Sequence, residues 1–154
     1  MQLHGFLSAS VKKQGQPPKQ LAFMKHNLLT DAGRDWMHAQ VYTNTSAGTR
    51  GAGYIASTES SITPAAANTT LTGEISTNGL ARADATTKTH SAGTNSTTIE
   101  HTFTAAGAFT SVLASATFNA ASVGTMPHIA NFSTGSGTLA TNDTLKITWT
   151  LNLG

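Results

Sequence analysis

The chain has 154 residues, of which 38% are hydrophobic and 10% are charged. This length fits one domain with a sizeable core. None of the residues is cysteine, which excludes disulfides, thiolate metal sites and cysteine nucleophiles. An average globular chain carries roughly 25% charged residues, so much of this surface is neutral and polar. No apolar run approaches the roughly 20 residues of a membrane span, and the N-terminus lacks the apolar stretch of a signal peptide.

Residues 1–25 differ in charge from the rest. They hold four lysines and no acid, giving +4, whereas the remaining 9 − 4 = 5 basic and 7 acidic residues give −2. Pro17 and Pro18 remove two backbone donors and favour extended chain. We predict an extended N-terminal arm that docks on a partner, with a disordered tail as the alternative. The residues predicted to make that contact are Leu3, Phe6, Leu7, Lys12, Lys13, Lys19, Leu21 and Phe23.

The stretch "NLLTDAGRDWMHAQVY" opens the second predicted unit, residues 26–154, with a helix at about 28–42. Thr30 or Asp31 suits the N-cap. Apolar residues recur every four positions, which is typical of a helix packed along one stripe. We expect Trp36 to anchor this helix against the rest of the domain.

Strand patterns dominate the remainder. "YIAS" predicts a short strand, and "ITPAAANTTLTGEI" is irregular, with Leu71 and Ile75 at an edge of the core. From residue 80 onward, segments with strand composition alternate with turn sequences. The strand segments are "LARADATTKTH", "TTIEHTFTA", "FTSVLASATFN", "MPHIANFS" and "TLKITWTLNLG". This spacing predicts an all-β protein, an antiparallel β-sandwich or jelly roll with one short N-terminal helix.

Alternation within these strands predicts the core. In the last segment every second residue from Leu145 to Leu153 is large and apolar, which predicts a central, half-buried strand. "TTIEHTFTA" places Ile99, His101 and Phe103 on one face, and "FTSVLASATFN" does the same for residues 112, 114, 116 and 118. The predicted core residues are Trp36, Ile99, Phe103, Phe118, Leu145, Ile147, Trp149 and Leu151.

No motif for catalysis or cofactor binding is present. The six histidines show no metal-ligand spacing, and the carboxylates are single and scattered. "STGSGTL" around Ser136 lacks the spacing of a nucleophile elbow. Four lysines without interleaved aromatic residues are a weak nucleic-acid footprint. We therefore expect no enzyme, no catalytic residue, no metal, no cofactor, no specific nucleic acid and no membrane partner.

Several ordered signatures resemble one family. These are "NLLTDAGRDWMHAQVY", "NTTLTGEI", "GLARADAT", "HSAGTNSTTIEHTFTAAGAFTSV", "FNAASVGTM" and "DTLKITWTLNLG". Together they are similar to small virion proteins of tailed bacteriophages over roughly residues 26–154. The family's usual Gly-Thr-Gly turn after the helix is replaced here by "GAGYIASTE".

The resemblance implies a structural role in the virion, which assembles in the cytoplasm of the bacterial host. The resemblance leaves two such roles open. One is a capsid decoration (cement) protein that binds the major capsid protein and neighbouring copies of itself, as a homotrimer, and stabilises the head. The alternative is a tail, baseplate or tail-fibre component involved in host attachment. The predicted loops contain no Trp or Tyr, which favours decoration over a receptor-binding head.

Overall fold

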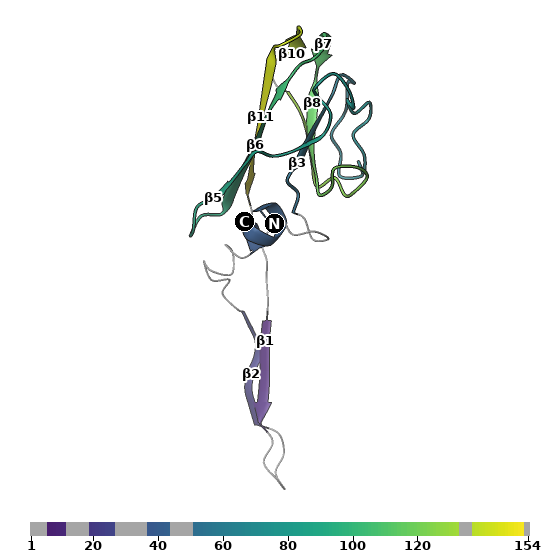
Figure 1. Ribbon diagram of the computed structural model, residues 1–154. Helices are drawn as coiled ribbons and strands as arrows, with labels where there is room; N and C mark the ends of the chain where they lie inside the picture. The colour runs from purple at the N-terminus through teal and green to yellow at the C-terminus, as the bar shows by residue number, and fades with distance from the viewer. Residues whose placement is uncertain (1–5, 12–18, 27–36, 44–50, 133–136, 153–154) are drawn as a thin grey trace.

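The computed structural model describes residues 6–11, 19–26, 37–43, 51–132 and 137–152, and only the backbone of the first two ranges (Figure 1). Apart from a short helical segment, the regular structure in these ranges is β. The strands are β1 (Phe6–Val11), β2 (Lys19–His26), β3 (Tyr54–Thr58), β4 (Ala83–Asp84), β5 (Thr87–His90), β6 (Ser96–Thr104), β7 (Phe109–Val112), β8 (Ala114–Phe118), β9 (His128–Asn131), β10 (Gly137–Leu139) and β11 (Thr144–Asn152).

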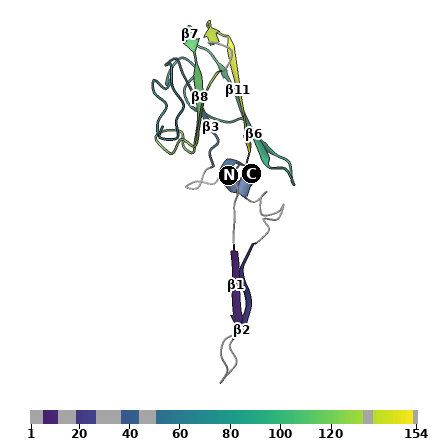
Figure 2. The same ribbon diagram turned by 180° about the vertical axis from the view of Figure 1, so that it is seen from behind.

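These strands form four antiparallel sheets within the described residues. The two larger ones have the orders β11-β6-β5 and β4-β3-β8-β9, and the two smaller ones are the pairs β10-β7 and β1-β2. Opposite views show β11 alongside β6 and β3 alongside β8 (Figures 1 and 2). The prediction of a protein built mostly of antiparallel β-strands is confirmed for the described residues.

β11 pairs with β6 along its whole length, from Thr144 opposite Thr104 to Asn152 opposite Ser96. The predicted alternation of buried and exposed side chains is present in β11, because Ile147 and Leu151 are buried while the Thr and Lys residues of the strand are exposed. Each buried aliphatic side chain contributes roughly 1.5–3 kcal/mol. The prediction of a central strand is wrong, however. β6 occupies the centre of this sheet and β11 lies at its edge, because alternation reports which face is buried and not how many neighbours a strand has.

β3 and β8 are buried on both faces. On one side Ile55 joins the larger core cluster, which also takes Ile99, Phe103 and Ile147 from the β11-β6-β5 sheet. On the other side a second cluster is closed by irregular chain, and its members are Tyr54, Ala56, Leu71, Ala116, Phe118 and Met126. The small residues of β3 and β8 suit strands that are covered on both sides.

Two segments predicted as single strands are each divided between sheets. "LARADATTKTH" gives β4, paired with β3, and then β5, paired with β6. "FTSVLASATFN" gives β7 and β8 in different sheets, so Val112 and Phe118 belong to different core clusters. At Leu113, between β7 and β8, the backbone N–H donates to the carbonyl of Thr58 (2.9 Å). Turn residues do not mark these breaks, which is why composition did not reveal them.

The described part of the predicted helix is short. Residues 37–43 are helical, with Ala39–Thr43 forming the π-helical turn η1. Trp36 and the predicted cap lie outside the described residues. The N-terminal arm has one unpredicted feature, since β1 and β2 pair with each other, with Phe6 opposite His26 and Val11 opposite Lys19.

Candidate functional site

The described residues hold no group of three or more His, Cys, Asp or Glu side chains placed to bind a metal ion. His101, predicted as a partly buried core histidine, is half-buried, and its Nδ1 lies 2.9 Å from the carbonyl of Asp84. The described carboxylates are engaged with main chain, threonine hydroxyls or cations.

The sequence-predicted contact residues are only partly described. Phe6 and Leu7 lie in β1, and Lys19, Leu21 and Phe23 lie in β2. Leu3, Lys12 and Lys13 lie outside the described residues. The pairing of β1 with β2 brings the two predicted apolar groups, residues 6–7 and 21–23, into one hairpin.

Most of the predicted core residues are where the alternation placed them. Ile99, Phe103, Phe118, Ile147 and Leu151 are each at most 5% exposed. Leu145 and Trp149 are half-buried against the larger cluster. Trp149 reaches between sheets, since its indole N–H donates to the Ser115 hydroxyl of β8 (3.2 Å).

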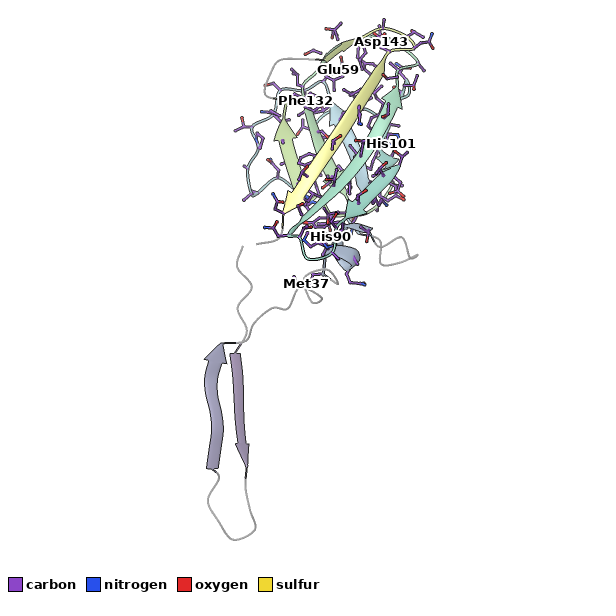
Figure 3. All side chains as sticks on the ribbon, turned by 90° about the vertical axis from the view of Figure 1, so that its left-hand side faces the viewer. Met37, Glu59, His90, His101, Phe132 and Asp143 are labelled. Atoms are coloured by element: carbon purple, nitrogen blue, oxygen red, sulfur yellow. The ribbon has the colours of Figure 1, made fainter. Side chains whose placement is uncertain are left out.

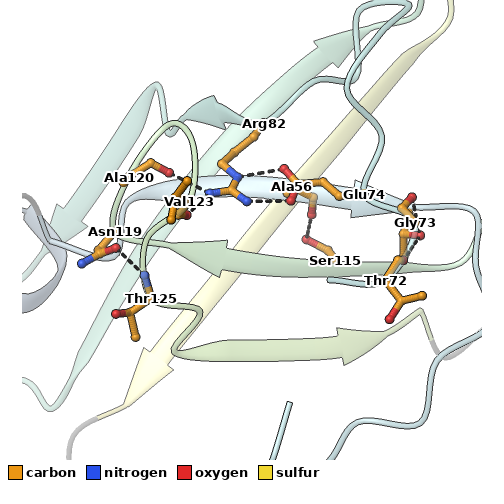
Figure 4. Close-up of polar contacts among 11 residues, drawn as sticks. Ala56, Thr72, Gly73, Glu74, Arg82, Ser115, Asn119, Ala120, Val123 and Thr125 are labelled. Carbon is orange, nitrogen blue, oxygen red and sulfur yellow. Dashed lines mark hydrogen bonds and ion pairs between the residues drawn. The ribbon is translucent and has the colours of Figure 1, made fainter. Parts of the chain in front are cut away.

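Arg82 organises the loop between β8 and β9, and sequence reasoning missed it. Its Nε and Nη2 donate to the two carboxylate oxygens of Glu74 (2.8 and 2.6 Å). Its Nη1 donates to the carbonyls of Ala120 (3.0 Å) and Val123 (2.7 Å), as Figure 4 shows. The guanidinium carbon lies 3.5 Å from the centre of the Phe118 ring. We call this set the Arg82 network, and it fixes a loop about forty residues away in sequence.

The tip of that loop has an unusual backbone. Val123 has φ 57° and Gly124 has φ 80°. Positive φ at two successive positions is a backbone that Asn-Gly adopts readily and that valine does not. A β-branched residue at positive φ is an outlier that costs on the order of 1–3 kcal/mol. Val123 is also 87% exposed. A valine before glycine in the turn sequence "SVGT" is the sequence signal that could have identified it.

Near the loop lies an open pocket of about 420 Å³, which we call the Trp149 pocket. Its lining is mixed in character, with Asn68 and His128 as the polar side chains. The apolar lining residues are Pro64, Ala65, Ala66, Met126, Pro127, Ile129 and Trp149. Burial lowers the pKa of His128, and Thr117 Oγ1 lies 2.9 Å from its Nδ1. The pocket therefore presents an uncharged surface at neutral pH.

A cluster of histidine and tyrosine rings joins the helical segment to the sheets. The His38 ring stacks on His90 with 4.2 Å between centroids, and its Nδ1 lies 2.5 Å from Thr97 Oγ1. Tyr42 lies between His38 and His128, with centroids 5.7 and 6.1 Å away. Figure 3 places His90 at the same end of the body as Met37, with Glu59 and Asp143 at the other end. His38 is fully buried, so we interpret this cluster as the attachment of residues 37–43 to the sheets.

Comparison with known proteins found no matching family model, no matching curated protein and no matching solved structure. Across the described residues, the chain contains no helix with the length and apolar character needed to cross a membrane.

Proposed function

We propose that this protein is a structural virion protein of a tailed phage, a decoration protein that binds the outer surface of the capsid and stabilises the head. The resemblance of residues 26–154 to small phage virion proteins supports this proposal. The lack of a metal-binding cluster among the described residues is compatible with it.

We further propose that the two larger sheets stack as a β-sandwich of jelly-roll type. The larger core cluster supports this, because it takes Ile55 from one sheet and Ile99 and Ile147 from the other. The hydrogen bond from Trp149 to Ser115 links the same two sheets.

The strongest support for the proposal is the difference in net charge between the N-terminal segment and the body. Residues 1–25 are +4, whereas the body segments 51–132 and 137–152 hold three basic and five acidic residues, giving −2. Two-stranded hairpins are marginally stable alone in water. A basic hairpin of this kind therefore suits docking on an acidic capsid surface, where strand pairing gives affinity.

Repetition on a lattice would strengthen such contacts. A decoration protein that associates as a homotrimer presents three hairpins. When all three bind the capsid at once, weak single contacts add up to high avidity. A weakly charged Thr, Ser and Ala surface suits close packing of many identical copies.

The test is co-sedimentation with phage particles that lack this protein. A variant without residues 1–25 should keep the circular dichroism spectrum of a folded β body and lose particle binding. A full-length variant with Glu at positions 12, 13, 19 and 25 should also lose binding, because its hairpin then repels an acidic surface. Normal decoration by the truncated chain would show that the proposal for the hairpin is wrong.

A further inference from the structure

β11 is an edge strand without the usual features of a protected edge. Within the described residues it pairs with β6 on one side and with no strand on the other. It is nine residues long, contains no proline and pairs with β6 without a register shift. The other edge strands of the two larger sheets, β4, β5 and β9, have only two to four residues. Proteins keep their sheet edges short, bulged or charged, because a long regular edge pairs with further strands.

The one charged residue of β11 does not protect this edge. Lys146 Nζ lies 2.9 Å from Glu100 Oε2, and Glu100 belongs to β6. The lysine side chain therefore leans towards the neighbouring strand of its own sheet and leaves the free side of β11 uncharged.

The backbone groups that point to the free edge follow from the pairing. Immediately before β11, the N–H of Ala105 donates to the carbonyl of Asp143 (2.8 Å). Hydrogen-bonded positions alternate along an antiparallel pair, and the register with β6 stays constant from Thr144 to Asn152. The odd-numbered residues of β11 therefore bond to β6. The N–H and C=O groups of the even-numbered residues point outward.

The inner side of this edge is incompletely covered. Leu145 and Trp149 are half-buried, whereas Ile147 and Leu151 are buried. A hollow of about 150 Å³ lies beside them, lined by Ser115, Ala130, Phe132, Ile147, Thr148 and Trp149. A strand added to β11 would extend the apolar layer at this hollow. The occupant therefore needs apolar side chains at alternate positions and polar ones between them.

β11 of a second copy meets these requirements on the outer face. In an antiparallel pair centred on Thr148, Thr148 faces its equivalent and Lys146 faces Thr150. Facing threonines are a favourable cross-strand pair, and β11 already makes one with β6, where Thr150 is opposite Thr98. The two copies of Lys146 would be four residues apart, roughly 13 Å. That distance exceeds the screening length of about 8 Å at physiological ionic strength.

The same pairing also matches the inner face and the backbone. Leu145 faces Leu151 and Ile147 faces Trp149, so apolar side chains meet apolar side chains. Even-numbered residues of one strand face even-numbered residues of the other. Their outward N–H and C=O groups are therefore aligned for hydrogen bonds between the two copies.

The β1-β2 hairpin is a poorer occupant of this edge. Its pairing has two register shifts, between Leu7 and Ala9 and between Ala9 and Ser10. Such irregularities are one way in which proteins protect edges. The hairpin also belongs to a segment with a net charge of +4, and Lys19 and Lys25 lie in β2. The regular, self-matching strand is therefore the better partner.

We propose that β11 of one copy pairs antiparallel with β11 of a second copy about a two-fold axis at Thr148, which joins two three-stranded sheets into one. Such a contact uses the same surface on both copies, and main-chain hydrogen bonds supply its affinity. The inference goes beyond the proposed function. The two-fold contact is additional to the proposed homotrimer, and on a capsid it would join neighbouring trimers.

Sedimentation velocity on the purified 154-residue chain, without particles, tests the association. The wild-type chain should form a species of about twice the mass of the Thr148→Pro chain at the same concentration, because proline removes an outward N–H and association weakens about tenfold or more. Proline is tolerated on the free side of an edge strand, so the pairing with β6 should persist. Thr148→Ala keeps the N–H and should associate like wild type. Equal masses of the wild-type and proline chains would overturn the proposal.

Disulfide cross-linking tests the register without the proline variant, since the chain has no cysteine of its own. Thr148→Cys should form dimers with itself, because facing residues lie within the roughly 4.4–6.8 Å that a disulfide spans between Cα atoms. Lys146→Cys should cross-link efficiently only when mixed with Thr150→Cys. Thr102→Cys, exposed on the same face but on the central strand β6, is the control and should remain monomeric. Equal cross-linking of the Thr148 and Thr102 variants would contradict the proposed pairing.

A third mixture tests the alternative occupant. Ala9→Cys, on β1, is combined with Thr148→Cys, and the proposal predicts dimers of the Thr148 variant in preference to mixed dimers. A preference for mixed dimers would show that the hairpin occupies the edge, and would overturn the proposal. Because these experiments use no particles, failure of this contact is distinguished from failure of capsid binding.

Discussion

The indole N–H of Trp149 on β11 donates to the hydroxyl of Ser115 on β8, 3.2 Å away. Ser115 in turn donates to the carbonyl of Ala56 on β3 (2.8 Å). One buried hydroxyl thus connects the edge strand of the β11-β6-β5 sheet to the two central strands of the other large sheet.

We predict that Trp149→Phe lowers the free energy of unfolding by about 1–2 kcal/mol, since it removes this hydrogen bond and some buried area. Ser115→Ala should show a coupling energy with it of about 0.5–1.5 kcal/mol in a double-mutant cycle measured by urea denaturation. Thr138→Ala, on β10, serves as the control and should add to Trp149→Phe without coupling. Full additivity of the Trp149 and Ser115 changes would show that the bond does not stabilise the fold.

The Arg82 network gives a second prediction. Arg82→Met leaves the Glu74 carboxylate and two loop carbonyls without their donor, and the Arg82 side chain is only 9% exposed. We expect the free energy of unfolding to fall by about 2–4 kcal/mol in urea denaturation. Lys146→Met breaks the ion pair with Glu100 at a lysine that is 60% exposed, and should change stability little. Equal effects of the two changes would contradict the role assigned to Arg82.

Val123→Asn should stabilise the isolated chain, by about 1 kcal/mol, because asparagine adopts positive φ more readily than valine. The measurement is urea denaturation at a protein concentration too low for self-association. Val123→Ala removes the β-branch but remains unfavourable at positive φ, so a smaller gain is expected. An asparagine variant less stable than wild type would mean that the turn is not strained.

His128 predicts a pH dependence. Burial lowers its pKa below the ordinary value of 6.5, so below about pH 6.5 the unfolded chain binds this proton more readily than the folded chain. Stability therefore falls as pH drops from about 6.5 towards the lowered pKa. His128→Asn keeps a polar side chain beside Thr117 but cannot titrate. The melting temperature should fall less in this variant than in wild type between about pH 7.5 and about pH 5.5, and identical slopes would exclude His128 as the cause.

Local sequence patterns were enough to predict which residues of a strand are buried. The alternation of β6 and β11 identified Ile99, Phe103, Ile147 and Leu151 as core residues, because a period of two reports burial directly. Strand order was not predictable in this way. The edge position of β11 and the change of sheet at Leu113 depend on pairings between residues far apart in the chain.

The candidate surface illustrates the same limit. Arg82 contacts carbonyls 38 and 41 residues later, and nothing in its neighbours along the chain marks this. The Trp149 pocket likewise combines residues 64–68, 126–129 and 149. The unusual position of Val123 could have been identified from the sequence, since a valine before glycine in a turn departs from the favoured Asn-Gly pair.

The place that we propose for this protein is the phage head, and its position on purified particles distinguishes the head from the tail. Immunogold electron microscopy with an antibody against the 154-residue chain should show label over the whole head surface, many copies to a particle. Label confined to the tail, or particles without label, would show that the proposal of a head decoration protein is wrong.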